Sequence, residues 1–372
     1  MTFRIERSVT EHAVVLTVSG DIGIADTPDV RALLEEDFTR PVVLALEQVA
    51  VVDRAGVQLL ADCELRGATL ANCPGYVREW IEREKELRMA STETATIGEG
   101  TFAGVGGLKI FFRSWRPSVG ARGVVAIVPG FNAHSGCYDW VANELVARGL
   151  AVYAVDLRGR GKSDGERFYV EKFTDYITDV ATFVSLAKSR ESGLPLFLLG
   201  HSAGGVVSCL YTIDHQAELA GLICESFAFK VPAPDFALAV FKGLSHIAPH
   251  AHVLHLKNED FSRDPKVVDA MNADPLIAHE TQPTQTLAEM VRADERLERS
   301  FSEMTLPLLI LHGTADKATK PSGSQFFYDT AGSRDKTLKL YEGGFHDLLN
   351  DLDKRVVMAD ITAWIDGRLS TV

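Results

Sequence analysis

Residues 200–204, with the sequence GHSAG, constrain the fold of this chain more than any other stretch. An apolar run at 196–199 precedes them and reads as a buried strand, and the small residues of 205–210 are compatible with a helix. A strand, a tight turn with a serine at its tip and a helix form a nucleophile elbow, in which the serine backbone is strained. The positions beside the turn need almost no side chain, as Gly200 and Gly204 provide. The pattern therefore predicts that Ser202 is a nucleophile, although five residues of this kind also arise by chance.

Charge and cysteine usage exclude several classes of function. The formal net charge of −13 repels nucleic acid phosphates, so no nucleic acid partner is expected. The first residues lack a signal-peptide core, and the apolar runs are far shorter than the ~20 residues that span a bilayer. The 5 cysteines form no C-x-x-C pair, which is typical of reduced thiols. We therefore expect a cytoplasmic protein.

The first 82 residues are predicted to form a separate small α/β domain (1–82), followed by a polar linker (83–100). Strands are expected at 3–9, 13–18, 41–46 and 66–70, and helices at 27–38, 57–63 and 76–82.

This order of elements resembles the STAS domains of anti-sigma factor antagonists. The match rests on the strand at 42–46 and the turn at 53–56. Phosphoswitch members of that family carry a serine after the aspartate of the turn, where Arg54 and Ala55 stand here. The resemblance implies a non-catalytic module at residues 3–82, for docking a protein partner or for self-association, and does not support a phosphoswitch.

From residue 101 to 372 the pattern predicts a larger α/β domain with a doubly wound, mostly parallel sheet. Its expected strands are apolar and are separated by helical stretches such as 138–148 and 173–189; they lie at 109–115, 124–128, 152–155, 196–199, 222–224, 308–311 and 338–341. In such sheets the ligand-binding and catalytic residues lie at the carboxyl ends of the strands.

Two late strands are followed by the residues that a nucleophilic serine needs. Asp316 follows the strand at 308–311, and His346 follows the strand at 338–341. A histidine takes the proton of the serine, and an acid fixes the histidine tautomer and stabilises its cation. The order Ser202, Asp316, His346 is that of α/β-hydrolases. The backbone NH groups of Phe131 and Ala203 are the predicted oxyanion hole.

Several residues compete for these roles. Glu225 also ends a strand, where some hydrolases place their acid, and His134 could be a base but precedes the serine in the chain. Asp347 and His312 are interpreted as structural neighbours. In the glycine-rich loop 156–165, Asp156 and Arg158 are expected to brace the elbow region, because the spacing fits no phosphate-binding fingerprint. The histidines of residues 246–255 are read as a surface cluster, so neither a metal nor a cofactor is predicted.

Residues 226–303 interrupt the sheet pattern and are interpreted as a cap. Helices are expected at 236–244, 264–273 and 286–301. The first is strongly apolar, so it could line an acyl-chain tunnel, make peripheral lipid contact or simply pack on the sheet.

Taken together, these segments resemble the monoacylglycerol lipase branch of the α/β-hydrolases, a group also described as serine aminopeptidase-like hydrolases or lysophospholipases. The resemblance covers residues 101–368 and rests on segments 134–145, 156–170, 195–205, 262–277, 311–319 and 336–351. It implies Ser202 as nucleophile, Asp316 as acid and His346 as base, with no cofactor.

Two features depart from that family. The oxyanion strand ends in Pro129-Gly130, where the family usually has His-Gly, and Ala133 and Cys137 stand where animal lipases carry a glutamate and an arginine. We therefore expect a serine ester hydrolase that acts on small-molecule, apolar acyl esters, without a defined preference for monoacylglycerol. The alternatives are a regulatory protein whose hydrolase domain senses a ligand, and an amide or peptide hydrolase.

Overall fold

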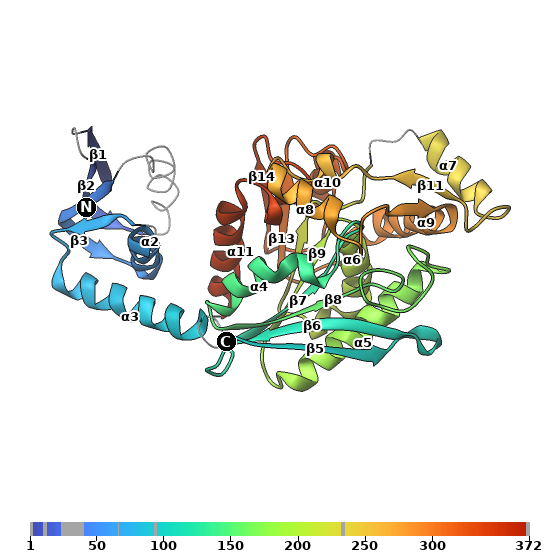
Figure 1. The fold of residues 1–372 in the computed structure, drawn as a ribbon, viewed down its shortest axis with the longest axis horizontal. Coiled ribbons are helices and arrows are strands. Elements are labelled where there is room, and N and C mark those ends of the chain that lie inside the picture. Colours follow the sequence, from blue (N-terminus) through green and yellow to red (C-terminus); the bar gives the residue numbers. More distant parts are fainter. Residues whose placement is uncertain are drawn as a thin grey trace. The chain divides into compact units, whose positions relative to one another are not determined.

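The computed structural model describes residues 3–9, 13–23, 41–65, 67–92, 95–231 and 235–369. These residues fall into two compact units, Met1–Glu93 and Thr94–Val372, each with a hydrophobic core of its own (Figure 1). None of the helices within these ranges combines the length and the apolarity that crossing a membrane requires.

Alternating burial along the strands builds the core of the first unit. Its sheet has the order β1-β2-β3-β4. Strand β1 (Arg4–Val9) is antiparallel to β2 (Val14–Ile22), whereas β2, β3 (Val42–Val52) and β4 (Thr69–Ala71) are parallel. Helices α2 (Arg54–Leu65) and α3 (Gly75–Thr92) complete the unit. The predicted succession of strands and helices over 41–82 is confirmed, and the helix predicted at 27–38 lies outside the described residues.

The stretch predicted as a linker, 83–100, has regular structure at both ends. Helix α3 continues to Thr92, and strand β5 (Thr96–Ala103) begins four residues later. Polar side-chain pairs such as Lys85 with Glu82, 3.1 Å apart, support a helix without an apolar run. Strand β5 is a largely exposed edge strand, so it also lacks the apolar signature of a buried strand.

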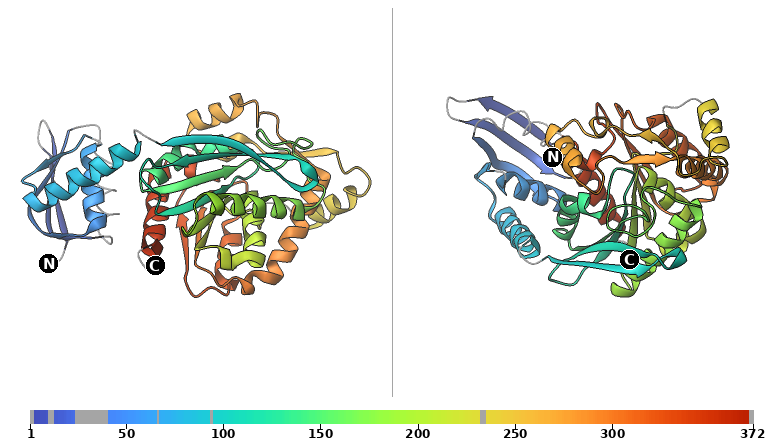
Figure 2. Two further views of the ribbon diagram at one scale, coloured as in Figure 1. Left: turned by 90° about the horizontal axis from the view of Figure 1, so that it is seen from below. Right: turned by 45° about the vertical axis from the view of Figure 1, so that its right-hand side comes forward.

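The doubly wound α/β sheet predicted for the second unit is confirmed. Its strand order is β14-β13-β10-β9-β7-β8-β6-β5. Strands β7 (Gly123–Val128), β8 (Leu150–Val155), β9 (Leu196–His201), β10 (Gly221–Glu225), β13 (Leu308–Gly313) and β14 (Lys336–Tyr341) are parallel. Strand β6 (Lys109–Arg116) is antiparallel to β5 and β8. In Figure 2 the teal strands β5 and β6 run side by side at one edge of the sheet.

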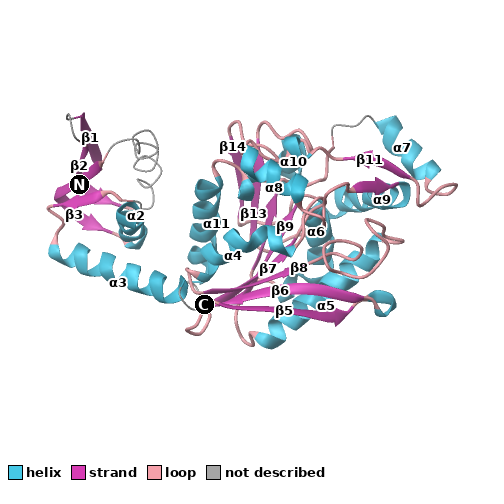
Figure 3. Cartoon of the chain, in the orientation of Figure 1, coloured by secondary structure: helices cyan, strands magenta, loops and turns pink. Residues whose placement is uncertain are grey.

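Helices cover both faces of this sheet because its strands are apolar on both faces (Figure 3). Along β7, Val125 and Ile127 pack with helices α4 (Asp139–Val146) and α11 (Lys354–Leu369). The alternate residues Val124 and Ala126 lie in the core with α5 (Phe173–Arg190) and α6 (Ala203–His215), and α10 (Pro321–Thr330) packs against β13 and β14 in the same core. Because β7, β9, β10, β13 and β14 are parallel, their carboxyl ends lie at a single edge of the sheet.

The segment between β10 and β13 forms the cap. Its helices are α7 (Asp235–Leu244), α8 (Pro265–Ala273) and α9 (Thr284–Ser300), close to the bounds expected from the sequence. Strand β11 (His252–His255) pairs antiparallel with β12 (Thr281–Pro283), and Figure 1 shows α7 beside α9. Ala293 and Leu297 of α9 belong to the core below the cap, which anchors this helix on the sheet.

Candidate active site

Ser202 lies at the tip of the turn between β9 and α6. Its φ of 53° and ψ of −120° lie in a region that residues other than glycine rarely adopt. A Cβ at Gly204 would lie 2.1 Å from the carbonyl oxygen of Val128, and a Cβ at Gly200 would lie 2.7 Å from the carbonyl oxygen of Gly204. The two glycines are therefore required by close backbone approach, as the elbow interpretation predicts.

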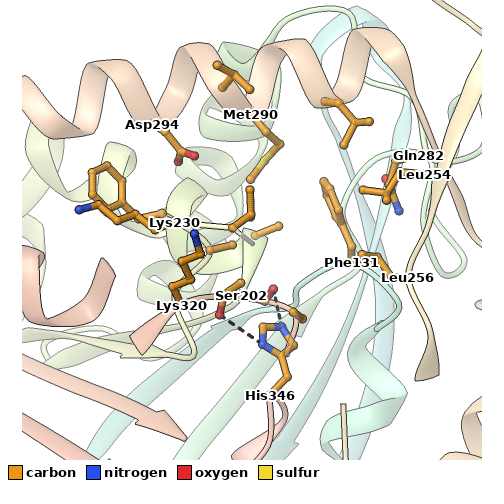
Figure 4. Close-up of a pocket in the computed structure, with 18 of the residues that line it drawn as sticks. Phe131, Ser202, Lys230, Leu254, Leu256, Gln282, Met290, Asp294, Lys320 and His346 are labelled. Carbon is orange, nitrogen blue, oxygen red and sulfur yellow. Dashed lines mark hydrogen bonds between the residues drawn. The ribbon is translucent and has the colours of Figure 1, made fainter. Parts of the chain in front are cut away.

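A hydrogen-bonded chain joins Ser202 to the two later strand ends. The distance from Ser202 Oγ to His346 Nε2 is 2.8 Å (Figure 4). The distance from His346 Nδ1 to Asp316 Oδ2 is also 2.8 Å. If Nδ1–H donates to the carboxylate, the Nε2 lone pair accepts from the serine hydroxyl, as proton removal from Ser202 requires. The structure thus brings together the three residues that the sequence nominates.

The surroundings of Asp316 keep its carboxylate charged. Burial opposes ionisation, but the adjacent His346 and His312 hold the pKa of Asp316 far below its usual range. The backbone NH groups of Ala318 and Thr319 donate to Oδ1 at 2.8 and 2.9 Å, and the Thr319 hydroxyl donates to Oδ2 at 2.8 Å. His312 is thus a structural neighbour as predicted. Thr319 was missed, although its position three residues after an aspartate is typical of an Asx turn.

The predicted oxyanion donors lie beside the serine. Ala203 is the first residue of α6, where helix NH groups have no partner within the helix and the helix dipole favours negative charge. Phe131 follows Gly130, at which a Cβ would lie only 2.7 Å from Ser202 Cβ. The glycine therefore lets the loop after β7 approach the nucleophile.

The competing residues have other partners within the described part of the chain. Glu225 Oε1 accepts from the NH of Leu348 at 2.9 Å and from the hydroxyl of Ser226 at 3.0 Å. Burial, and then the charge of Asp347, raises the pKa of Glu225 well above its usual range. His346 Nδ1 instead contacts Asp316 Oδ2 at 2.8 Å, so Glu225 does not occupy the position of the triad acid.

The loop residues His134, Asp156 and Arg158 are structural. His134 contacts Asp274 at 2.8 Å and accepts from the NH of Gly136 at 3.0 Å. Asp156 accepts from the NH of Ser135 at 2.6 Å, which braces the loop after β7. The prediction that Arg158 braces the elbow region is wrong. In the described structure Arg158 pairs with acidic residues of α5, and its distance to Asp179 is 2.7 Å.

Within the described ranges, one group of side chains offers metal-ligand atoms within 4.8 Å of one another: His201, Glu225 and Asp347, all buried. Burial raises the pKa of both carboxyl groups. Metal ligands must be deprotonated, and the raised pKa of both carboxyl groups opposes this, so the cluster is poorly suited to hold a cation. Three of the histidines of 246–255 have separate partners: His250 contacts Glu166 at 2.8 Å, His252 contacts Thr281, and His255 contacts the backbone of Glu280.

A cavity of about 950 Å³ opens above Ser202 and His346. Figure 4 shows Leu254 and Leu256 on one side, near Phe131, and Met290 above. The cap supplies most of the apolar lining; its further members are Phe241, Phe261, Leu287 and Val291. Lys230, Lys320 and Asp294 add polar groups on the other side. The arrangement is that of an activated serine at the base of an apolar chamber.

Comparison with known proteins decides the family. The model of the family described as "Serine aminopeptidase, S33" matches residues 120–353. The chain belongs to this α/β-hydrolase family. It is 34% identical to a monoacylglycerol lipase of Mycolicibacterium smegmatis over 280 residues, which cover 74% of this chain and 99% of the relative. It is 32% identical to the monoglyceride lipase of Homo sapiens, over 71% of this chain and 89% of the relative.

Solved structures of other proteins share the fold. A monoglyceride lipase of Saccharomyces cerevisiae, solved with a substrate analogue, superposes with a TM-score of 0.67 at 21% identity, over 74% of this chain and 96% of that one. The monoacylglycerol lipase of Paleococcus ferrophilus gives 0.62 at 26% identity, over 74% and 99%. The chain is accordingly a serine hydrolase of carboxylic esters with a lipase-like fold. The family match begins at residue 120, so it does not extend to the first unit.

Proposed function

We propose that the second unit hydrolyses small, apolar acyl esters through an acyl-enzyme on Ser202. The observation that carries this is the continuous hydrogen-bonded chain from Ser202 through His346 to Asp316, with 2.8 Å at each step, at the base of an apolar cavity.

Each step follows from that chain. Ser202 Oγ attacks the ester carbonyl while His346 Nε2 takes its proton, and Asp316 stabilises the resulting imidazolium. The NH groups of Phe131 and Ala203 bind the oxyanion of the tetrahedral intermediate. The proton then passes from His346 to the departing alcohol. A water molecule, deprotonated by the same histidine, releases the acid and restores Ser202.

The test is the substitution Ser202→Ala. It should abolish turnover of p-nitrophenyl esters while the thermal unfolding of the protein stays unchanged, and a fluorophosphonate probe should label the native protein at Ser202 alone. Undiminished turnover by the variant would overturn the proposal. Activity on p-nitroanilides exceeding that on matched esters would favour the alternative, an amide or peptide hydrolase that uses the same residues.

We propose that the enzyme accepts alcohol groups other than glycerol. Ala133 is buried and Cys137 half-buried, and neither offers the charged group that the lipase resemblance implies at these positions. Equal values of kcat/KM for a 1-monoacylglycerol and for the ethyl ester of the same acid would support this. A preference of more than about tenfold for the monoacylglycerol would contradict it, because that factor corresponds to a specific polar contact.

We propose that the cap makes peripheral contact with lipid, as a source of apolar esters. The large apolar side chains of Val240, Ile247 and Val253 are 52%, 83% and 45% exposed. Exposed apolar side chains that lie in one region mark a surface suited to contact with lipid or protein. Co-flotation with neutral phosphatidylcholine vesicles that is lost on Ile247→Ser would support the contact. Equal flotation of the two proteins would contradict it.

For the first unit we propose a STAS-like module that docks a cytoplasmic partner or a second copy of the chain. The Asp53 carboxylate accepts from the NH of Gly56 at 2.8 Å, which caps α2 after the turn on which the resemblance rests. Exposed Tyr76 and Trp80, one helical turn apart on α3, offer an apolar surface. Removal of residues 1–93 should leave the ester kcat within about threefold and abolish any self-association seen by light scattering. Loss of activity would instead favour a regulatory role for this unit.

A further inference from the structure

Arg160 lies in the loop after β8 and is only 1% exposed, although arginine is rarely buried to this extent. Its charge is balanced by Glu280, with which it forms an ion pair whose two side chains are each 1% exposed. A buried guanidinium needs several partners in fixed positions. The partners of Arg160 therefore show which parts of the chain this side chain connects.

One of these partners is the residue with the candidate oxyanion NH. Arg160 Cζ lies 3.7 Å from the centroid of the Phe131 ring and 5.6 Å from that of Phe168. A guanidinium stacked on an aromatic ring at this distance is attracted to it, the more so where water is excluded. Arg160 therefore restrains the position of Phe131 through its side chain.

The other partners belong to the cap. Arg160 Nη2 donates to Gln282 Oε1 at 2.8 Å, and Gln282 Nε2 donates to Glu280 Oε1 at 2.7 Å. Gln282 lies in β12, immediately before α9, and it lines the same cavity as Phe131 (Figure 4). The loop of Phe131 also bonds to the cap directly, since Asn132, the residue after Phe131, donates from Nδ2 to Asn258 Oδ1 at 2.9 Å.

We propose that Arg160 is a positioning residue that couples the cap to the oxyanion hole. With β12 seated, Glu280 and Gln282 hold the guanidinium against Phe131, and the NH of Phe131 is held towards the reacting carbonyl. Displacement of β12 releases the guanidinium and with it the oxyanion donor. This inference rests on the proposed function, because it assigns the role of Phe131 in acyl transfer.

If Arg160 positions the oxyanion donor, its loss has an effect that would not be expected if Arg160 only packed in the core or only contacted the substrate. An ester too short to reach the cap, such as p-nitrophenyl acetate, should still react more slowly when the link is cut, because its oxyanion needs the same NH. A role in stability alone would alter thermal unfolding but not kcat. A role in chain binding alone would alter KM for long esters.

The experiment compares two double variants of the full chain. Arg160→Met with Glu280→Met removes the link together with its buried counter-charge. Arg158→Met with Asp179→Asn is the matched control, since it removes another buried arginine–carboxylate pair two residues away in the same loop, whose side chains are 8% and 2% exposed. Thermal unfolding of each protein is measured first, and the kinetics are run well below the lowest melting temperature.

We expect the Arg160 variant to lose about 10- to 100-fold in kcat for p-nitrophenyl acetate with KM changed by less than about threefold, because loss of a whole oxyanion donor costs about 100- to 1,000-fold. The control should retain kcat within about threefold, and Arg160→Lys should recover only part of the loss. Equal losses in both variants, or a loss confined to long-chain esters, would overturn the coupling.

A second readout separates this inference from the proposed function. The rate of fluorophosphonate labelling of Ser202 depends on the nucleophile and the oxyanion hole, whatever the natural substrate. If the native protein turns over no ester but labels at Ser202, and the labelling rate falls only in the Arg160 variant, the coupling holds and the proposed substrate class fails. If labelling occurs at Ser202 at equal rates in all variants, the coupling fails, while the assignment of Ser202 as nucleophile holds.

If the double variant of Arg160 does not fold, the single variant Arg160→Lys is used in its place. An unchanged labelling rate in that variant overturns the coupling.

Discussion

Replacement of Asp316 by asparagine tests the proposed triad by changing a single atom. The side-chain oxygen Oδ1 accepts from the NH groups of Ala318 and Thr319 at 2.8 and 2.9 Å. These donors will hold the amide oxygen of the variant in the same place. The amide nitrogen then takes the place of Oδ2, 2.8 Å from His346 Nδ1, to which it can only donate.

The consequence is a histidine in the wrong tautomer. His346 must then accept at Nδ1 and carry its proton on Nε2, which faces Ser202 Oγ at 2.8 Å. It can no longer take the serine proton. A triad disturbed in this way loses about 10⁴-fold in kcat, which at about 1.4 kcal/mol per factor of ten is about 5.5 kcal/mol of transition-state stabilisation.

The assay is steady-state turnover of p-nitrophenyl butyrate, with thermal unfolding as a check on the fold. Glu225→Gln is the matched control, because a protonated carboxyl and an amide have nearly the same shape and the pKa of Glu225 is raised by burial. We expect Asp316→Asn to retain about 10⁻⁴ of kcat and Glu225→Gln to stay within about threefold. The reverse pattern would refute the reasoning and make Glu225 the acid.

Three further results are expected. Gly204→Ala should abolish turnover and destabilise the protein, because the new Cβ would lie 2.1 Å from the carbonyl oxygen of Val128. Gly243→Ala has open space around it in α7 and should raise the free energy of unfolding by about 0.5–1 kcal/mol. Denaturant titration measures both variants, and equal effects would contradict the elbow geometry. Because burial raises the folded-state pKa of Glu225, the folded protein binds this proton more tightly than the unfolded chain, which releases it above about pH 4.3. The contribution of Glu225 to stability should therefore fall as pH rises above that value, by up to about 1.4 kcal/mol per pH unit, and Glu225→Gln should reduce the slope measured by denaturant titration. Because the cavity of about 950 Å³ is lined mainly by apolar side chains, kcat/KM should rise from acetyl to octanoyl esters by up to about fourfold per methylene, and a flat series would contradict an acyl chain bound there.

Much of the catalytic arrangement could be predicted from the sequence because its determinants are local. Buried parallel strands appear as apolar runs, and the residue after each run lies at the carboxyl edge of the sheet. Ser202 and Asp316 follow such buried runs, whereas His346 follows the more exposed edge strand β14. Because the three strands are parallel, all three residues lie at one edge of the sheet. The elbow is equally local, since its glycines are required by neighbours within a few residues.

What escaped prediction depends on contacts between distant parts of the chain. Arg160 and Glu280 are separated by 120 residues, and neither lies in a pattern that points to the other. The same holds for the bond between Asn132 and Asn258, 126 residues apart. The structure of 83–100 is not predictable for another reason: low apolar content indicates a linker, but an exposed helix and an edge strand are also polar.

The most direct test of the account is the intact mass of the protein during turnover. The enzyme is mixed with an excess of p-nitrophenyl decanoate, quenched in acid within milliseconds, and its peptides are mapped. We expect the mass of one decanoyl group on the peptide that contains Ser202, together with a burst of one p-nitrophenolate per active site. A burst with the acyl group on another residue, such as the half-buried Cys137, or turnover with no acylated peptide, would contradict it.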